Sequence, residues 1–193
     1  MNELSALADL IETTFDLKLE IISGGNSANL EWALSGAETG RINDLRLGEA
    51  ILLGCETLHR QPINNLFTDA FTLVAEVIET KVKPSQPSGT IAQTAFGEAS
   101  PVVARGLVSQ SILAIGRQDT DLHGLTPPAG IEILGASSDH LIVVSNSGEL
   151  PVGSEVAFQL NYSALVHAMT SPFVGRIVKN SDYGGTGVVA MHE

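Results

Sequence analysis

The sequence is poor in cysteine and in positive charge, and each shortage excludes a class of protein. A single cysteine, Cys55, among 193 residues excludes an intrachain disulfide framework. Ten lysines and arginines stand against 22 aspartates and glutamates, which gives a net charge of −12. Because this charge repels phosphate backbones and anionic lipids, we expect no nucleic-acid partner and no membrane partner.

Long apolar runs are also missing. No stretch is long enough to span a bilayer, and we see no cleavable apolar leader, so we expect a cytoplasmic protein. Apolar residues nevertheless make up 44% of the chain and charged residues only 17%, a balance typical of folded globular proteins. Cys55 follows the apolar run 50–53 without evident His and Asn partners, so we interpret it as an inert thiol.

The first 65 residues alternate between helix and strand patterns. The order of these elements predicts a parallel pair of strands with flanking helices. A closed (β/α) barrel takes about 250 residues and eight strands, so this segment is expected to be a partial barrel remnant. The predicted elements are a helix over 4–15, a strand over 17–22, a glycine turn at 23–27, a helix over 28–34, a strand over 42–46, a turn at 47–48 and a helix from 49 to 53.

After Pro62 the pattern changes to short strands bounded by Gly, Pro, Asn or Asp. Their spacing predicts a β-barrel or sandwich, which makes the fold class α/β plus all-β. We therefore expect a truncated (β/α) portion at 1–65, a β domain at 66–180 and a flexible tail at 181–193. The predicted elements are strands over 70–82, 111–115, 131–134, 141–145 and 155–160, and a helix over 163–169.

Two segments of the first part are suited to an anion. In residues 23–29, glycines let the backbone approach a phosphate and a helix start offers free N–H groups, although an N-cap by Asn26 or Ser27 explains the same letters. Arg46 ends a predicted strand, at the edge where (β/α) proteins keep their active sites, and Gly48 follows it. A structural ion pair of Arg46 with Asp44 or Glu49 is the alternative interpretation.

Two segments of the second part carry ionisable groups. Asp139 and His140 follow a run of small residues and form a candidate acid/base pair. As neighbours on a strand they would point to opposite faces, which speaks against direct contact. Oxygen and imidazole donors alternate in the segment 119–123, but without further ligands we interpret it as a solvated loop and expect no metal site.

Taken in order, these segments resemble the alanine racemase family, and most closely its alanine/ornithine racemase branch. Residues 25–29, Gly-Asn-Ser-Ala-Asn, are similar to a phosphate-binding turn of that family, and residues 44–49 are similar to its Arg-x-Gly segment. Residues 135–140 resemble the part of the branch that faces the substrate. Residues 160–162 resemble the tyrosine segment that reaches the cofactor phosphate.

The resemblance implies a fold-type III enzyme that uses pyridoxal 5′-phosphate (PLP). It implies that Ser27, Gly48, Glu49 and Tyr162 bind the PLP phosphate and that Arg46 donates to the pyridine nitrogen. The partners it implies are a small amino-acid substrate and a second copy of the chain in a head-to-tail homodimer. Alanine, ornithine and other basic amino acids remain open as substrates.

The sequence departs from the family pattern at two places. No residue before Ser23 lies on the strand that carries the family's Schiff-base lysine, and Phe96 stands where the tyrosine base of alanine racemase is expected. We therefore expect the C-terminal portion of a racemase that is inactive alone and pairs with a lysine-bearing segment. Asp139 and His140 remain as acid/base candidates, with Glu98 as a further one. The alternative is a non-catalytic binding or assembly module derived from that family.

Overall fold

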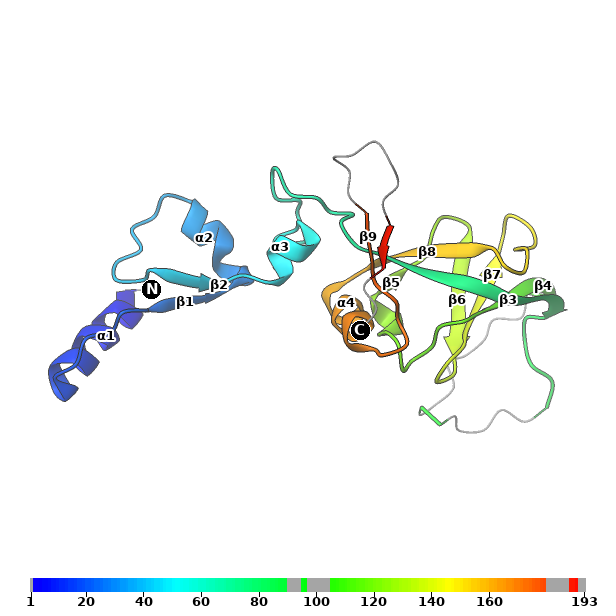
Figure 1. Cartoon of the computed structure of the whole chain (residues 1–193), viewed down its shortest axis with the longest axis horizontal. Coiled ribbons are helices and arrows are strands. Elements are labelled where there is room, and N and C mark those ends of the chain that lie inside the picture. Colours follow the sequence, from blue (N-terminus) through cyan, green and yellow to red (C-terminus); the bar gives the residue numbers. More distant parts are fainter. Residues whose placement is uncertain (1, 90–94, 97–104, 180–187, 191–193) are drawn as a thin grey trace. The chain divides into compact units, whose positions relative to one another are not determined.

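The computed structural model describes residues 2–89, 95–96, 105–179 and 188–190. The chain divides into two compact units, Met1–Phe71 and Thr72–Glu193 (Figure 1). No described helix combines the length and apolar character that a bilayer crossing requires.

The first unit contains one short parallel pair of strands. In this pair Ser23 lies opposite Asp44, and Asn26 lies opposite Arg46. A small core of Ala8, Ile22 and Ile42 joins the first helix to the strands. The elements of this unit are α1 (Asn2–Phe15), β1 (Ser23–Asn26), the 3₁₀ turn η1 (Ser27–Asn29), α2 (Leu30–Leu34), β2 (Asp44–Arg46) and α3 (Glu49–Leu53).

The predicted strand over 17–22 is wrong, because side chains take the hydrogen bonds that a neighbouring strand would otherwise supply. The Leu19 N–H donates to Glu12 Oε1 over 2.7 Å, and the Ile22 N–H donates to Asn43 Oδ1 over 2.9 Å. Asn43 Nδ2 in turn donates to the Glu20 carbonyl over 2.8 Å. Ladder pairing therefore begins only at Ser23, inside the segment that we predicted as a turn.

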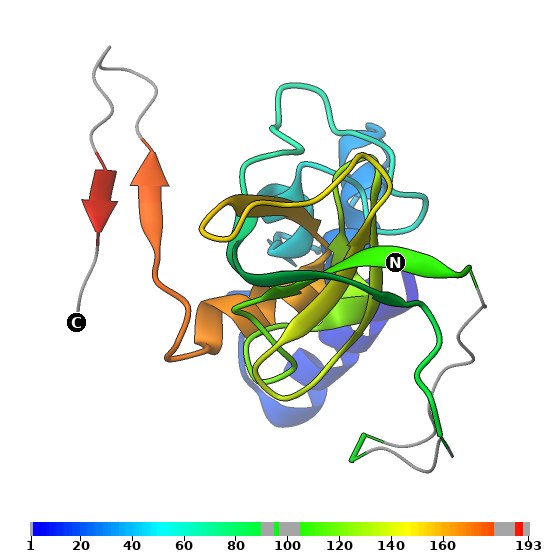
Figure 2. The same cartoon turned by 90° about the vertical axis from the view of Figure 1, so that its right-hand side faces the viewer.

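The second unit is built on a six-stranded antiparallel sheet in the order β5-β8-β3-β4-β7-β6. Figure 2 shows this sheet strongly curled, as half of a barrel. The predicted fold class, a (β/α) remnant followed by a β domain, is confirmed. The elements are β3 (Thr72–Pro84), β4 (Leu107–Leu113), η2 (Leu122–Gly124), β5 (Leu125–Thr126), β6 (Ile131–Ala136), β7 (Leu141–Ser145), β8 (Glu155–Leu160), α4 (Tyr162–Thr170), β9 (Ile177–Lys179) and β10 (Val188–Ala190).

The core of the second unit follows from strand alternation. Leu73, Ala75 and Val77 are buried on β3 while their neighbours face outward, as the two-residue period of a strand requires. Phe158 on β8 is fully buried in the same cluster, and Ala164 and Ala168 of α4 pack against it. This core fixes β8 and therefore the start of α4, where Tyr162 lies.

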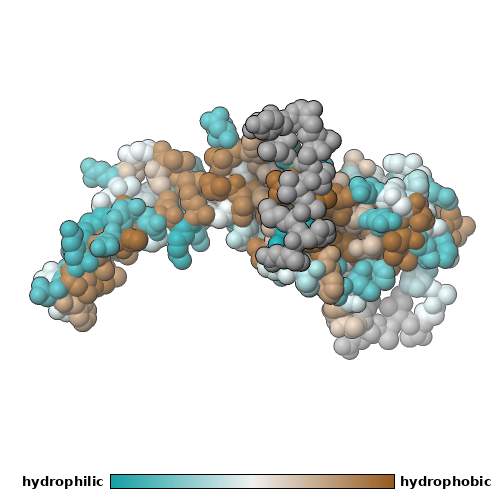
Figure 3. Space-filling model, in the orientation of Figure 1, coloured by the Kyte–Doolittle hydropathy of each residue, from teal (hydrophilic) through white to brown (hydrophobic). Residues whose placement is uncertain are grey.

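Several large apolar side chains of the first unit are exposed. Phe15, Ile21 and Leu34 are 68%, 69% and 71% exposed. The visible face of this unit accordingly carries several apolar areas (Figure 3). Such areas are typical of surfaces that another segment or subunit covers.

Candidate functional site

Two asparagine side chains organise the turn at the end of β1. Asn26 caps η1 by accepting the Ala28 N–H over 3.1 Å, and Asn29 Nδ2 donates to the Gly24 carbonyl over 2.7 Å. Gly25 has φ +116°, and a Cβ there would lie 2.3 Å from Asn29 Nδ2. The cap that we attributed to Asn26 or Ser27 therefore belongs to Asn26, and the Ser27 hydroxyl is left for another contact.

That contact joins the two predicted anion segments. The Ser27 side chain is buried, and its Oγ accepts the N–H groups of Gly48 and Ala50, both over 3.3 Å. The ends of parallel strands meet at one edge of a sheet, which brings residues 21 and 23 positions apart together. The predicted contact of the Glu49 backbone with a phosphate stays a prediction, and the structure adds Ala50 to the amides beside Ser27. No described acceptor takes the proton of the Ser27 hydroxyl.

Arg46 is the last residue of β2 and lies opposite Asn26, beside this turn. Among the described residues it forms no hydrogen bond and no ion pair. The alternative partner Glu49 is bound by Arg60 instead. The guanidinium of Arg46, with five N–H donors and a fixed positive charge, is therefore available to a ligand.

Tyr162 belongs to the second unit, where it is the first residue of α4 and 37% exposed. Asn161 caps this helix by accepting the Ala164 N–H over 2.9 Å. A Cβ at Gly124 would lie 2.1 Å from Asn161 Oδ1, so the absence of a side chain at Gly124 allows the preceding loop to pack against the cap. The phenol of Tyr162 is thus held at a well-defined helix start.

Asp139 and His140 lie in the turn between β6 and β7, so strand alternation does not separate them. Asp139 Oδ1 and His140 Nδ1 are 3.3 Å apart, and both side chains are about half exposed. The hydroxyls of Ser138 and Ser137 donate to the Asp139 carboxylate and lower its pKa. An aspartate of this kind stays ionised at neutral pH and can orient the imidazole beside it. Glu98 lies outside the described residues.

The interpretation of residues 119–123 as a solvated loop is wrong for Asp119. This carboxylate is buried and accepts the Gly116 N–H over 2.9 Å and the Ser171 hydroxyl over 3.1 Å. Asp121 caps η2, and the hydroxyl of Ser163 lowers its pKa. No cluster of three or more metal-ligating side chains occurs in the described part of the chain.

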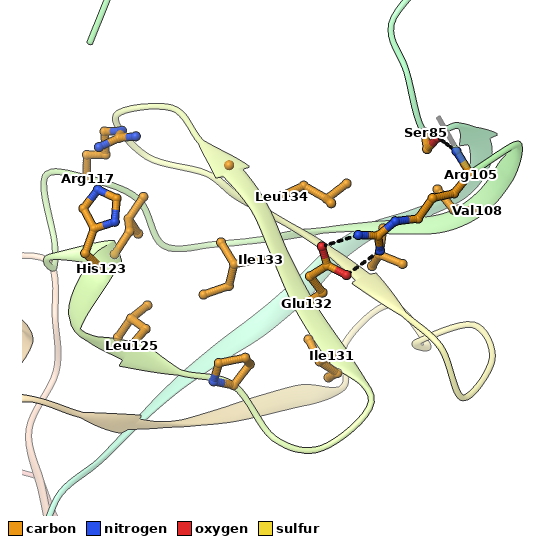
Figure 4. Close-up of a pocket in the computed structure, with 14 residues that line it drawn as sticks. Ser85, Arg105, Val108, Arg117, His123, Leu125, Ile131, Glu132, Ile133 and Leu134 are labelled. Atoms are coloured by element: carbon orange, nitrogen blue, oxygen red, sulfur yellow. Dashed lines mark hydrogen bonds and ion pairs between the residues drawn. The ribbon is translucent and has the colours of Figure 1, made fainter. Parts of the chain in front are cut away.

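The sequence analysis missed one hollow of the second unit, a cavity of about 570 Å³ beside β6. Figure 4 shows Arg117 and His123 at one end and the ion pair of Arg105 with Glu132 at the other. Apolar side chains of β5 and β6 line the space between these ends. The Arg117 guanidinium also lies 4.9 Å from the centre of the Phe96 ring. Only the folded sheet brings these residues together.

Solved structures share this architecture. A D-threonine aldolase from Filomicrobium marinum has a TM-score of 0.58 at 13% identity, with 95% of this chain and 44% of the other covered. An alanine racemase from Oenococcus oeni has a TM-score of 0.52 at 19% identity, with 86% of this chain and 49% of the other covered. These likenesses place the chain in the fold class of alanine racemase.

Two proteins that are similar in sequence indicate a narrower group within this fold class. Ornithine racemase of Acetoanaerobium sticklandii is 42% identical over 177 residues, which are 90% of this chain and 50% of that protein. Lysine racemase of Thermotoga maritima is 40% identical over 177 residues, which are 91% of this chain and 50% of that protein. No protein-family model matches the chain. The chain spans about half the length of these relatives, and its sequence is similar to the C-terminal half of proteins of the alanine/ornithine racemase family.

Proposed function

We propose that this chain forms the C-terminal portion of a PLP-dependent amino-acid racemase and holds the phosphate of PLP where the turn after β1 meets the start of α3. The observation that carries the proposal is the contact of buried Ser27 with the Gly48 and Ala50 amides, in a chain about 40% identical to two racemases. The names of these two relatives favour a basic amino acid, ornithine or lysine, as the substrate.

The described residues suit a phosphorylated pyridine. Ser27 offers a hydroxyl proton, and the Gly48 and Ala50 amides, which donate to Ser27 Oγ in this structure, would turn their N–H groups to a phosphate dianion. Tyr162 would add a phenol donor to the same phosphate. Arg46 would donate to the pyridine nitrogen, and because a guanidinium stays protonated it does not take up a proton there. PLP, when bound, supplies the electron sink that makes the Cα proton of an amino acid acidic.

Racemisation needs a group that moves a proton at Cα. His140 is our candidate for this role, with the Asp139 carboxylate orienting its imidazole from 3.3 Å. Phe96 has no ionisable group and cannot contribute. We propose that a second copy of the chain completes the site in a homodimer.

We further propose that these 193 residues are inactive in racemisation by themselves. The sequence contains four lysines, and none lies on β1, β2 or α3. Lys81 and Lys83 donate to Glu79 on β3, in the other unit from Ser27. Turnover of ornithine, lysine or alanine by the purified chain, followed by polarimetry, would contradict this.

The test of the phosphate site uses pyridoxine 5′-phosphate, which has the ring and phosphate of PLP but no aldehyde to react with lysine amines. We expect the chain to bind it and to bind pyridoxine, which lacks the phosphate, far more weakly in equilibrium dialysis. Ser27→Ala should weaken binding about 10- to 100-fold, because a hydrogen bond to a charged group contributes roughly 1.5–3 kcal/mol.

Ser35→Ala is the matched control, because its exposed hydroxyl donates only to the Trp32 carbonyl in the same unit. This variant should bind like the wild type. Equal affinity for pyridoxine and its phosphate, or a Ser27→Ala variant that binds like the wild type, would exclude the proposed site. Phosphate-dependent binding together with racemase activity only in the presence of a lysine-bearing half would favour the enzyme over a non-catalytic module.

A further inference from the structure

Glu49 is the acidic residue that lies in the chain between the two backbone amides of the proposed phosphate site. Glu49 is the first residue of α3 and stands between Gly48 and Ala50, whose amides both donate to Ser27 Oγ. Its side chain is only 21% exposed. A partly covered charge is screened less by solvent than a fully exposed one, so an unpaired carboxylate here would repel a phosphate dianion.

Arg60 pairs with this carboxylate. Its Nη1 is bound to Glu49 Oε1, and its own side chain is 56% exposed. Arg60 is the partner of Glu49 among the described residues, while Arg46 on the strand before α3 stays unpaired. The two arginines therefore differ in what they can do: Arg60 neutralises a carboxylate of the chain, and Arg46 remains for a ligand.

The turn that presents Arg60 is held together without the Arg60 side chain. Cys55 and Pro62 form an isolated antiparallel bridge, and the Ile63 N–H donates to the Gly54 carbonyl over 2.8 Å. The Glu56 carboxylate binds three backbone N–H groups within the turn, which lowers its pKa. These donors are the amides of Leu58, His59 and Gln61. Removal of the Arg60 side chain should therefore leave the turn in place.

Arg60 itself has φ +59°, in the left-handed region that favours glycine. A non-glycine residue in this conformation costs roughly 1 kcal/mol. The chain thus keeps a conformationally costly arginine at a position where glycine would fit better. Anchoring of the turn by the ion pair would not by itself explain an arginine at this position, because exposed ion pairs contribute little to stability.

We propose that Arg60 is a positioning residue of the phosphate site, which cancels the charge of Glu49 and so permits a phosphate dianion to approach Ser27 and the Gly48 and Ala50 amides. This inference rests on the proposed function, because it concerns the same phosphate. Arg60 acts through Glu49 and is not itself placed on the phosphate.

The Arg60→Gly variant separates an effect of the lost charge on phosphate binding from an effect on the stability of the fold. It removes the guanidinium and relieves the left-handed backbone, so the Tm should stay the same or rise. Binding of pyridoxine 5′-phosphate in equilibrium dialysis should weaken about three- to tenfold, as expected for one unpaired charge near a partly exposed site. Binding of pyridoxine should not change, because it carries no phosphate.

Three further variants identify the cause. Arg60→Lys keeps the positive charge and should bind pyridoxine 5′-phosphate within about twofold of the wild type. The double variant Glu49→Gln with Arg60→Gly removes both charges and should restore binding to the same range. Lys18→Ala removes one positive charge before β1, at the opposite end of that strand, and should have little effect.

The outcomes are distinguishable. A wild-type chain that does not prefer pyridoxine 5′-phosphate to pyridoxine overturns the proposed function, and this inference with it. A wild type with that preference, combined with Arg60→Gly binding of unchanged strength, overturns the role of Arg60 alone. A double variant as weak as Arg60→Gly also overturns it, because the loss would then not come from the charge of Glu49.

Discussion

At the scale of single residues, the candidate site depends on side chains that support the backbone of a turn. Asn29 binds the Gly24 carbonyl, and Asn26 caps η1, so the Ser27 hydroxyl is directed at the Gly48 and Ala50 amides. Polar side chains that bind nearby backbone groups stabilise turns in this way. The turn is thus held in shape by side chains to which the proposed function gives no contact with the phosphate.

A substitution at Gly25 tests whether the Asn29 side chain holds the turn. Gly25→Ala places a Cβ 2.3 Å from Asn29 Nδ2 on a backbone with φ +116°. We expect the first unit to lose about 1–3 kcal/mol of unfolding free energy, from backbone strain together with the displaced Asn29 contact. Urea denaturation followed by Trp32 fluorescence measures this, because Trp32 packs against the core of that unit.

The matched control is Gly36→Ala. Gly36 also has a positive φ, of +75°, but a Cβ there meets nothing within 4 Å. A larger loss in Gly25→Ala is expected from the displaced Asn29 side chain together with the less favourable φ at that position. Equal losses in both variants would show that the Asn29 side chain does not hold the turn.

At the scale of elements, side chains fasten α1 to the segments that precede β1 and β2. Arg41 donates to Glu12 Oε1 over 2.7 Å and to Asp9 Oδ1 over 2.5 Å, and Glu12 Oε1 also accepts the Leu19 N–H. The hydrogen bond from Arg41, followed by that from Leu19, lowers the pKa of Glu12 from 4.5 to about 2. The helix is therefore held by a carboxylate that must stay ionised.

The sign of the pH effect follows from this lowered pKa. The stabilising contribution of Glu12 is complete above pH 4.5 and is lost as the pH falls toward 2. We expect the stability of the first unit, read from Trp32 fluorescence in urea, to fall more steeply over that range in the wild type than in Glu12→Gln. Glu20→Gln, whose carboxylate binds no described group, should follow the wild type. Parallel curves for wild type and Glu12→Gln would contradict the assignment.

The elements also show what the sequence can and cannot reveal. The bounds of β7 and β8 match the predicted strands 141–145 and 155–160, because alternation and turn residues are local signals. The predicted strand over 17–22 fails because the side chains of Glu12 and Asn43, 7 and 21 residues away from the amides they bind, compete with the ladder.

The same reasoning applies to the candidate site. Ser27, Arg46 and Gly48 were predicted from the resemblance of residues 25–29 and 44–49 to family segments, and their roles stay predictions. The Arg60 pair and the burial of Asp119, whose partner Ser171 is 52 residues away, depend on folding that no local pattern reports.

At the scale of the whole molecule, each unit has its own core. One cluster contains Ala8, Ile22 and Ile42, and the other runs from Leu73 to Ala168 around the fully buried Phe158. Ser27, Gly48 and Ala50 lie in the first unit. Tyr162 and the pair of Asp139 with His140 lie in the second unit. Each unit therefore carries its own candidate residues on a core that the other unit does not share.

Phe158→Ala tests the independence of the two cores. The cavity it leaves should destabilise the second unit by about 3–5 kcal/mol, and backbone hydrogen exchange on β3 and β8 should accelerate. Exchange in α1 and the fluorescence of Trp32 should not change, because neither belongs to that core. Ile42→Ala should give the reverse pattern. If either substitution accelerates exchange equally in both units, the units unfold as one cooperative body, and the phosphate turn depends on the β domain for its stability.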